Sequence, residues 1–484
     1  MTRDIDRRKF LKAGLAGMAV GGVSLPAAVK GAAESSKKIR EFHFTAYPAS
    51  VGLGNGPEFK AWTYNGKIPG PEIRVKEGEI IRVVLKNELP EPTTIHWHGI
   101  PLQNAMDGVP GVTQDPIPPK GTFTYEFVAK PAGTFFYHSH CGYQLDQGLY
   151  GLLVIEPARE RLSYDQEYSL MLEDWVMKDH GGIARIMRRP PLGPRNRNFM
   201  DGRVMGGDKK LGEEEPLLEP YYDSYAVNGK IVPAIDPIRV KKGDLVRLRI
   251  VNASSATNYD LRLANHELFI THTDGNPVRP QQVDILRIGM GERYDVAFRA
   301  NKPGRWLLAA RDTGLGESQI RIPVIYDGIS QGKLIPPMFW PSFEVSTVYD
   351  LEALEPVGPP EQKRDQYFRQ VLQWASEIPH WTINGYGYPK TENITVRKGE
   401  WTHIEYYNHS PMPHPMHMHG HFFRIVNLNM SPEYWIKKDT FLFDKHETVH
   451  VEFLADNPGR WFHHCHNLYH MVDGMANEVV YKQT

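Results

Sequence analysis

The sequence predicts an all-β protein that consists of three consecutive β-sandwich domains. Two observations support this prediction: one pattern of strands and turns occurs three times along the chain, and residues that form turns are abundant. The chain has 484 residues, which is more than one hydrophobic core usually holds. Its 43 glycines and 38 prolines are typical of short strands joined by turns.

The repeated pattern has the same features in the same order in each copy. An Asn-Gly turn is followed by an alternating strand, a turn of glycine and an acidic residue, another alternating strand and an asparagine. The three copies lie at residues 64–87, 227–252 and 383–408. A turn of proline and glycine followed by an aromatic residue then closes each copy. Repetition at nearly constant spacing indicates three copies of one folding unit, and frequent turns favour β-sandwiches.

These repeats divide the chain into domains. The first domain is predicted at residues 36–158, the second at 159–330 and the third at 371–484, with a linker rich in proline and glutamate at 331–370. Residues 177–222 fit no repeat, so they are predicted to be an insertion in the second domain.

Residues 1–35 are predicted to be a twin-arginine export signal. Arg7-Arg8 precedes a mild apolar stretch, Ala13 to Val29, which is short for a membrane-spanning helix. We expect export to the periplasm, the cell surface or the medium; the alternative is an N-terminal anchor helix. No other segment could span a bilayer, and 56 basic residues against 57 acidic ones give no sign of a nucleic-acid partner.

Histidines are concentrated in four short clusters. A chain of this length with 21 histidines should contain about one His-x-His pair by chance, whereas this chain contains five. The clusters are His96-Trp97-His98, His138-Ser139-His140, the run from His414 to His421 and the run from His463 to His470. Scattered structural histidines would not group in this way, so the clusters predict metal sites.

The last cluster places Cys465 between His464 and His466, with Met475 a few residues later. One cysteine, two histidines and a weak axial methionine are the ligands of a blue-copper electron-transfer site. In an extended strand, alternate side chains point to opposite faces. Cys465 would then face one metal and the two histidines another, with only a few covalent bonds between them. The pattern predicts electron transfer between two metal sites.

The repeats also indicate where the metals lie. The clusters occupy the same two places in the first and third units: after the asparagine loop and after the closing turn. The middle unit reads Asn258-Tyr259-Asp260-Leu261 and Arg311-Asp312-Thr313 at these places. We therefore expect the metals to lie where the first and third units meet, with the middle unit as a spacer.

The four clusters, in this order and spacing, resemble the copper signatures of the multicopper oxidases, with the nearest likeness to three-domain bacterial laccase-like enzymes and copper-resistance oxidases. The three units resemble the three cupredoxin-like Greek-key β-sandwich domains of that family. The resemblance implies four copper ions: one of type 1, one of type 2 and two of type 3. It implies type 1 ligands His414, Cys465 and His470 with Met475 axial, type 2 ligands His96 and His417, and type 3 ligands His98, His138, His140, His419, His464 and His466. His403, His409, His421 and His463 stay outside this set and are expected to be neighbours or surface residues.

Proton delivery is the second part of the chemistry that the resemblance implies. Asp107 matches the acid that family members place near the type 2 copper, which implies a catalytic role in proton transfer; the alternative is a plain turn residue before Gly108. Many bacterial members have a glutamate directly after the last type 1 histidine, where this chain has Met471, and Asp473 is a weak substitute. Cys141 is predicted to be a buried thiol; the alternative is a reactive thiol or an adventitious copper ligand.

The resemblance implies a laccase-like oxidase that takes single electrons from phenols, aryl amines or metal ions and reduces O2 to water with four electrons. We expect a monomer whose partners are O2 and a small aromatic or metal-ion donor. One alternative is a Cu(I) oxidase for copper tolerance, in which the methionines of residues 177–222 would form a lid. Met412, Met416 and Met418 also favour this alternative. Alternatives of another class are a non-catalytic cupredoxin scaffold, which would have lost copper ligands, and a copper-storage protein, which would not need the link through Cys465.

Overall fold

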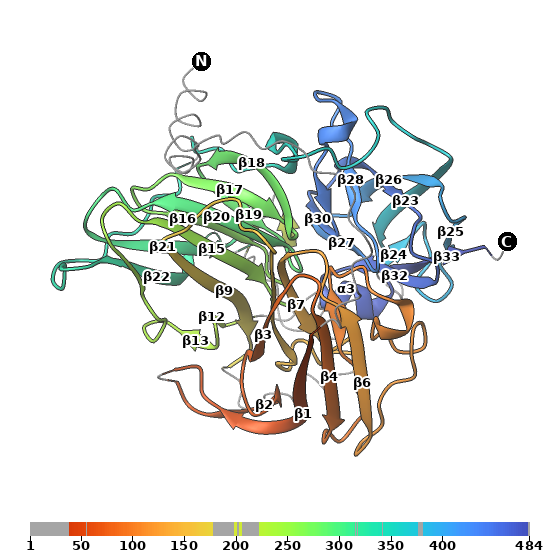
Figure 1. Ribbon diagram of the computed structural model, residues 1–484, viewed down its shortest axis with the longest axis horizontal. Coiled ribbons are helices and arrows are strands. Elements are labelled where there is room, and N and C mark those ends of the chain that lie inside the picture. Colours follow the sequence, from red (N-terminus) through yellow and green to blue (C-terminus); the bar gives the residue numbers. More distant parts are fainter. Residues whose placement is uncertain are drawn as a thin grey trace, which may run out of the picture.

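The computed structural model describes residues 38–54, 56–177, 198–200, 203–205, 222–314, 316, 318–340, 342–375 and 381–482. Nearly all regular structure in these residues is β-strand, and the one α-helix among them is α3 (Leu468–Asp473). Figure 1 shows three β-rich units around a shared centre: the first at the bottom, the middle one at the left and the third at the right. The all-β prediction is confirmed.

The first unit is a sandwich of two four-stranded sheets. One sheet has the order β2 (Phe59–Tyr64), β1 (Ile39–Val51), β4 (Ile80–Asn87), β6 (Thr122–Val128). The other has the order β3 (Gly70–Lys76), β8 (Tyr150–Glu156), β7 (Gly133–His138), β5 (His96–His98). A short 3-10 turn, η1 (Asn104–Met106), follows β5.

The middle unit is a larger sandwich of seven and five strands. The first sheet has the order β13 (Lys230–Ile231), β12 (Ser224–Val227), β9 (Gln166–Trp175), β15 (Leu245–Asn252), β20 (Arg293–Arg299), β17 (Leu268–Thr273), β18 (Asn276–Val283). The second has the order β14 (Ile238–Val240), β22 (Ser318–Tyr326), β21 (Arg305–Asp312), β16 (Tyr259–Leu263), β19 (Leu286–Ile288). Within the predicted insertion the structure describes one hairpin, β10 (Asn198–Met200) with β11 (Arg203–Met205).

The third unit is a sandwich of six and five strands. The first sheet has the order β24 (Trp381–Ile383), β23 (Gln366–Trp374), β26 (Trp401–His409), β31 (Thr448–Leu454), β28 (Phe423–Ile425), β29 (Lys437–Lys438). The second has the order β25 (Ile394–Val396), β33 (Ala476–Tyr481), β32 (Arg460–Cys465), β27 (His414–Met418), β30 (Thr440–Phe443). Two 3-10 turns accompany it, η2 (Val348–Asp350) and η3 (Pro432–Tyr434).

The Asn-Gly turns show why one sequence pattern gives one fold three times. Asn65, Asn228 and Asn384 all have positive φ, between 52° and 56°, and a glycine with positive φ follows each. Asparagine and glycine tolerate this left-handed conformation better than other residues. The side chain of each asparagine also accepts a backbone N–H from the first strand of its own unit, at 2.7 to 2.9 Å.

The strand pairing of the three units is equivalent. In each unit the first strand runs parallel to the strand after the glycine-acid turn: β1 with β4, β9 with β15, and β23 with β26. The strand before that turn runs parallel to the last strand: β3 with β8, β14 with β22, and β25 with β33. The prediction of three consecutive β-sandwich domains of one type is confirmed.

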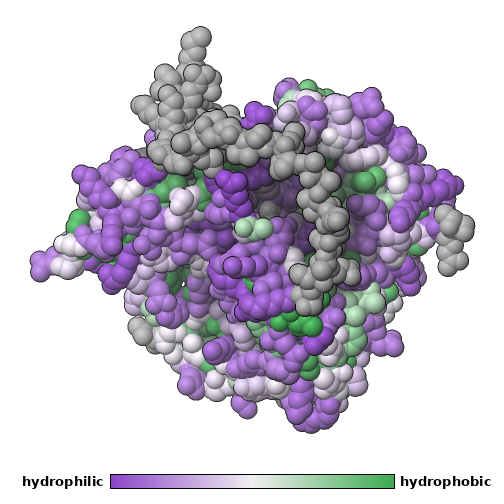
Figure 2. All heavy atoms as spheres, viewed as in Figure 1, coloured by the Kyte–Doolittle hydropathy of each residue, from purple (hydrophilic) through white to green (hydrophobic). Residues whose placement is uncertain are grey.

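The three units are packed together rather than strung out. One cluster of buried hydrophobic side chains contains residues from all three. Strand β7 of the first unit also lies against β15 and β20 of the middle unit. Figure 2 shows a mainly hydrophilic face with scattered hydrophobic patches. No helix in the described part of the chain is long and apolar enough to cross a membrane.

Candidate metal centre

Two pairs of neighbouring strands bring the four histidine clusters together. In the first unit β5 pairs with β7, which sets His96 opposite His138. In the third unit β27 pairs with β32, which sets His417 opposite His464. The two strand pairs face each other where the units meet, and His98 stacks on His417 with ring centroids 3.8 Å apart.

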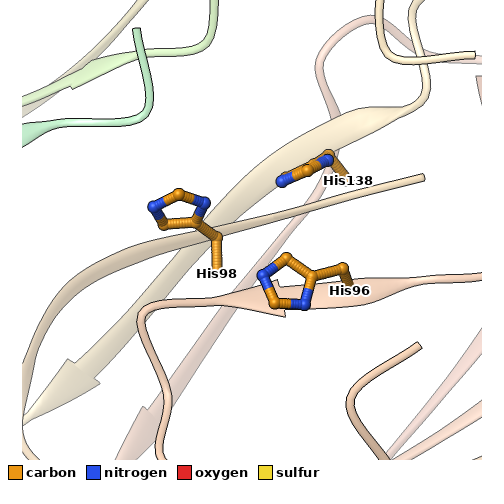
Figure 3. Close-up of side chains that lie close together, drawn as sticks. All are labelled: His96, His98 and His138. Atoms are coloured by element: carbon orange, nitrogen blue, oxygen red, sulfur yellow. The ribbon is translucent and has the colours of Figure 1, made fainter. Parts of the chain in front are cut away.

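Eight buried histidines form one cluster at this junction. They are His96, His98, His138 and His140 of the first unit, and His417, His419, His464 and His466 of the third unit. Figure 3 shows His96, His98 and His138 close together, with their rings around one space. Across the junction, Nε2 of His464 lies 3.4 Å from Nε2 of His140. The predicted meeting place of the first and third units is therefore where the structure gathers these residues.

The hydrogen bonds of these rings fit a metal site. Nδ1 of His96, His138 and His417 donates to the backbone oxygens of Asp107, Ser139 and Asp439 at 2.8, 3.0 and 2.9 Å. The Nε2 atoms of the same three rings are buried and have no hydrogen-bond partner among the described residues. A neutral imidazole with one nitrogen anchored and the other turned inward is the usual state of a metal ligand.

Burial favours the neutral imidazole in five histidines of this cluster. Desolvation is the largest cause that lowers the pKa of His98, His140 and His466 well below 6.5, and neighbouring imidazoles lower it further. The same two causes act on the pKa of His419 and His464. Near neutral pH their free nitrogen lone pairs are available to a cation, which is what copper binding requires.

A second, smaller group lies on the other face of β32. Sγ of Cys465 is 3.5 Å from Nδ1 of His414 and 3.6 Å from Nδ1 of His470, and the two nitrogens are 3.1 Å apart. Met475 is fully buried, and its backbone oxygen accepts a hydrogen bond from the Cys465 amide at 3.0 Å. One thiolate and two imidazoles around one point match the trigonal set of a blue-copper site.

The helix α3 brings His470 back to Cys465. Asn467 begins this helix, and its side chain accepts the backbone N–H groups of Tyr469 and His470. Gly474, at φ 131°, ends it. The indole of Trp381 covers the ring of His470 at a centroid distance of 3.8 Å.

The two groups are joined through adjacent residues of β32. Cys465 belongs to the smaller group, whereas Nε2 of His464 lies 3.1 Å from Nε2 of His419 in the larger one. Alternation along the strand therefore separates Cys465 from His464, as the sequence pattern indicates.

Asp107 lies inside the larger group. Its carboxylate is fully buried and accepts a hydrogen bond from Nδ1 of His419 at 2.9 Å, while its other oxygen is 3.2 Å from Nδ1 of His96. Gly108, at φ 81°, follows it, and a Cβ there would collide with the carbonyl oxygen of Ile95. Asp107 is thus both a turn residue and a contact of the histidines.

Asp439 is a member of the site that sequence reasoning missed. Its Oδ1 lies 3.1 Å from Nε2 of His98 and 3.5 Å from Nδ1 of His417. Nothing in the local sequence marks it, because Lys438-Asp439-Thr440 reads as an ordinary polar strand end outside the four clusters.

Met471 lines a pocket of about 500 Å³ beside the larger group. His140, Cys141, Phe462 and Met471 are among its lining residues. Burial raises the pKa of the Cys141 thiol to about 11, so this side chain is a poor thiolate nucleophile at neutral pH. Asp473 instead accepts the backbone N–H of Trp381 at 2.8 Å.

The histidines that the resemblance leaves out make other contacts. The ring nitrogens of His463 bond to Tyr406 and Asn477, at 2.8 and 2.6 Å, and those of His421 bond to the His419 carbonyl and to Tyr481, at 3.0 and 2.7 Å. His403 is buried beside Glu452 and His450, and His409 is exposed.

The comparisons with known proteins agree with this arrangement. Family models described as multicopper oxidase match residues 49–160, 166–323 and 358–484. The chain is 34% identical to "Multicopper oxidase MmcO" of Mycobacterium tuberculosis, over 99% of this chain and 97% of that protein. The chain belongs to the multicopper oxidase family.

Other multicopper oxidases and their relatives align over nearly the same length. "Copper resistance protein A" of Escherichia coli is 28% identical, with 98% of each chain covered. The crystal structure of a multi-copper oxidase from Pseudomonas thermotolerans has a TM-score of 0.70 and 29% identity, and covers 92% of this chain and 100% of that one. As a multicopper oxidase, this chain is an oxidoreductase that uses four copper ions and O2, so the predicted enzyme class and cofactor are confirmed.

Proposed function

We propose that the two groups hold the four copper ions of a laccase-like multicopper oxidase. The type 1 ion would be held by His414, Cys465 and His470, with Met475 as a weak fourth ligand. The type 2 ion takes His96 and His417. The type 3 pair takes His98, His138, His140, His419, His464 and His466. The observation that carries this assignment is the pair of inward-turned donor sets, one around Cys465 and one around eight histidines, joined by adjacent residues of β32.

When bound, copper supplies one-electron transfer at the Cys465 site and multi-electron reduction of O2 at the histidine cluster. The chain's own part is to hold the two sites a few bonds apart and to bury both sets of donor side chains. Asp107 supplies the proton-carrying group: its carboxylate touches His96 and His419 and can pass a proton to the adjacent cluster.

A copper-loaded preparation tests the assignment. We expect four copper ions per chain and an intense visible absorption that arises from the Cys465 thiolate. Cys465→Ser should abolish this absorption while most of the copper at the histidine cluster is kept. A colourless protein that contains four copper ions would contradict the assignment.

For the electron donor we propose phenols, aryl amines or metal ions, with small aromatics first. Relatives include proteins named laccase, which supports small aromatic donors. Cu(I) is the second candidate, since relatives include copper resistance proteins. Met412, Met416 and Met418 are all buried, which argues against a role in collecting Cu(I).

The lid proposed for Cu(I) lies largely outside the described residues. Rates with Cu(I) and with a phenol, measured with and without residues 177–205, separate the two donors. Equal Cu(I) rates would rule out the lid, whereas a selective loss of the Cu(I) rate would favour copper as the donor.

We also propose that the enzyme is a monomer exported by the twin-arginine route to the periplasm or beyond. Every copper ligand in the assignment comes from one chain, so a second copy is not needed. The signal at residues 1–35 lies outside the described residues and rests on Arg7-Arg8. Fractionation of an Arg7→Lys/Arg8→Lys variant tests the route, and light scattering tests the monomer.

A further inference from the structure

A group of buried charges lies where the middle and third units meet. Two cations and three carboxylates are each at most 3% exposed: Arg293, Lys438, Asp274, Glu292 and Asp439. Buried charges are costly unless each is paired. Lys438 Nζ lies 3.2 Å from both Asp274 and Glu292, and donates to Thr273 of the middle unit at 2.6 Å.

Arg293 connects all three units. It belongs to β20 of the middle unit, and its Nε donates to the backbone oxygen of Thr134 on β7 of the first unit at 3.2 Å. Its Nη1 and Nη2 donate to the two oxygens of Asp439 in the third unit, at 2.7 and 2.5 Å. Two parallel bonds from a planar guanidinium fix the direction of a carboxylate as well as its charge.

Asp439 in turn orients the rings of two histidines. Oδ1 lies 3.1 Å from Nε2 of His98, and the backbone oxygen accepts from Nδ1 of His417 at 2.9 Å. The hydroxyl of Thr440 lies within 3.0 Å of both rings and donates to Oδ1 of Asp439 at 2.8 Å. The remaining nitrogens, Nδ1 of His98 and Nε2 of His417, are the ones that are turned inward.

The backbone near His98 is adapted to this pair of charges. Gly99 follows His98 directly, at φ 86°, and a Cβ at this position would collide with the guanidinium of Arg293 and the carboxylate of Asp439. Gly291 of the middle unit similarly makes room for the ring of His466. The middle unit therefore lies against His466 at Gly291 and reaches His98 and His417 through the contact of Arg293 with Asp439, although it contributes none of the cluster histidines.

We propose that Arg293 is a positioning residue for the trinuclear copper site, which acts through Asp439 on His98 and His417. This inference rests on the proposed function, because those histidines are assigned there to the type 3 and type 2 ions. Partners that orient a metal-bound histidine are typically worth 10- to 100-fold in metal affinity. The middle unit is then part of the copper site rather than a spacer alone.

The test compares Arg293→Met and Arg293→Lys with a matched control. Arg424 of the third unit is nearly as buried as Arg293, and its Nε and Nη2 both donate to Oε2 of Glu452, at 3.2 and 2.9 Å. None of the assigned copper ligands is a partner of Arg424. For each loaded protein, copper per chain is measured during competition with a chelator, together with the visible thiolate absorption and the thermal midpoint.

We expect Arg293→Met to keep the thiolate absorption but to hold the cluster copper about 10- to 100-fold more weakly. Arg293→Lys keeps the charge but loses the contact of two nitrogens with Asp439. Its affinity for the cluster copper should therefore lie between those of Arg293→Met and the wild type, and it should retain the fold. Arg424→Met should keep all four ions, even if its thermal midpoint falls. Wild-type copper affinity in both Arg293 variants would overturn the inference, as would equal copper loss in Arg424→Met. A wild-type chain that binds no copper and shows no thiolate absorption would overturn the proposed function itself, an outcome distinct from both.

Discussion

The carboxylate of Asp107 accepts a hydrogen bond from Nδ1 of His419 at 2.9 Å across 312 positions of sequence. A carboxylate can carry a proton at this point, whereas an amide of the same shape cannot. We expect Asp107→Asn to lower kcat by about 100-fold or more. The copper content and the thiolate absorption should stay unchanged. Stopped-flow reoxidation of the reduced enzyme by O2 locates the slow step, and wild-type reoxidation in the variant would contradict the proton role.

Gly108 holds Asp107 in this position. We expect Gly108→Ala to destabilise the protein more than Gly78→Ala, although the two glycines have similar φ values of 81° and 88°. A Cβ added at Gly78 would have no atom within 4 Å, so Gly78→Ala is a control that contains the backbone strain without a clash. The clash with Ile95 should add about 2 kcal/mol to the loss of unfolding free energy. Denaturant midpoints of both variants give the difference; equal midpoints would show that the turn relaxes at no cost.

Local sequence patterns mark most of the metal centre, whereas contacts between distant residues complete it. The Asn-Gly turns and the His-x-His pairs are local patterns, so the fold and the four clusters could be predicted from them. Arg293 and Asp439 are 146 positions apart, and each reads locally as a solvated charge. Only the packing of the middle unit against the third reveals that both are buried beside His98.

The pH dependence of stability should contain a contribution from Glu173. Burial raises the pKa of this carboxyl from 4.5 to about 7, even though the Gly229 amide donates to it at 2.8 Å. Between pH 4.5 and about 7 the folded chain therefore binds more protons at this group than the unfolded chain. Stability contributed by this group is present below pH 4.5 and is lost as the pH rises toward about 7.

Glu173→Gln isolates that contribution, because the amide is neutral at every pH. We expect the variant to gain stability relative to the wild type between pH 5 and pH 8, by at most about 3 kcal/mol. Urea unfolding at a series of pH values measures the difference between the two proteins, which removes the effects of other titrating groups. If the unfolding free energies of the two proteins changed with pH in parallel, Glu173 would be charged in the folded state.

Met471 occupies the position at which the resemblance implies a glutamate in many bacterial members of the family, and it lines the pocket beside His140 together with Phe462 and Val109. A carboxyl group in such apolar surroundings has a raised pKa, which suits a general acid near neutral pH. We expect Met471→Glu to turn over faster than Met471→Gln, by about tenfold at pH 7.

Met471→Gln is the matched control, because it has the same size and polarity but cannot release a proton. The advantage of glutamate should shrink as the pH rises above the pKa of the new carboxyl and its protonated fraction falls. Steady-state O2 consumption from pH 5 to 9, with copper content checked for each protein, measures both effects. Equal rates in the two variants at every pH would mean that protons reach the cluster fast enough from the side of Asp107 alone.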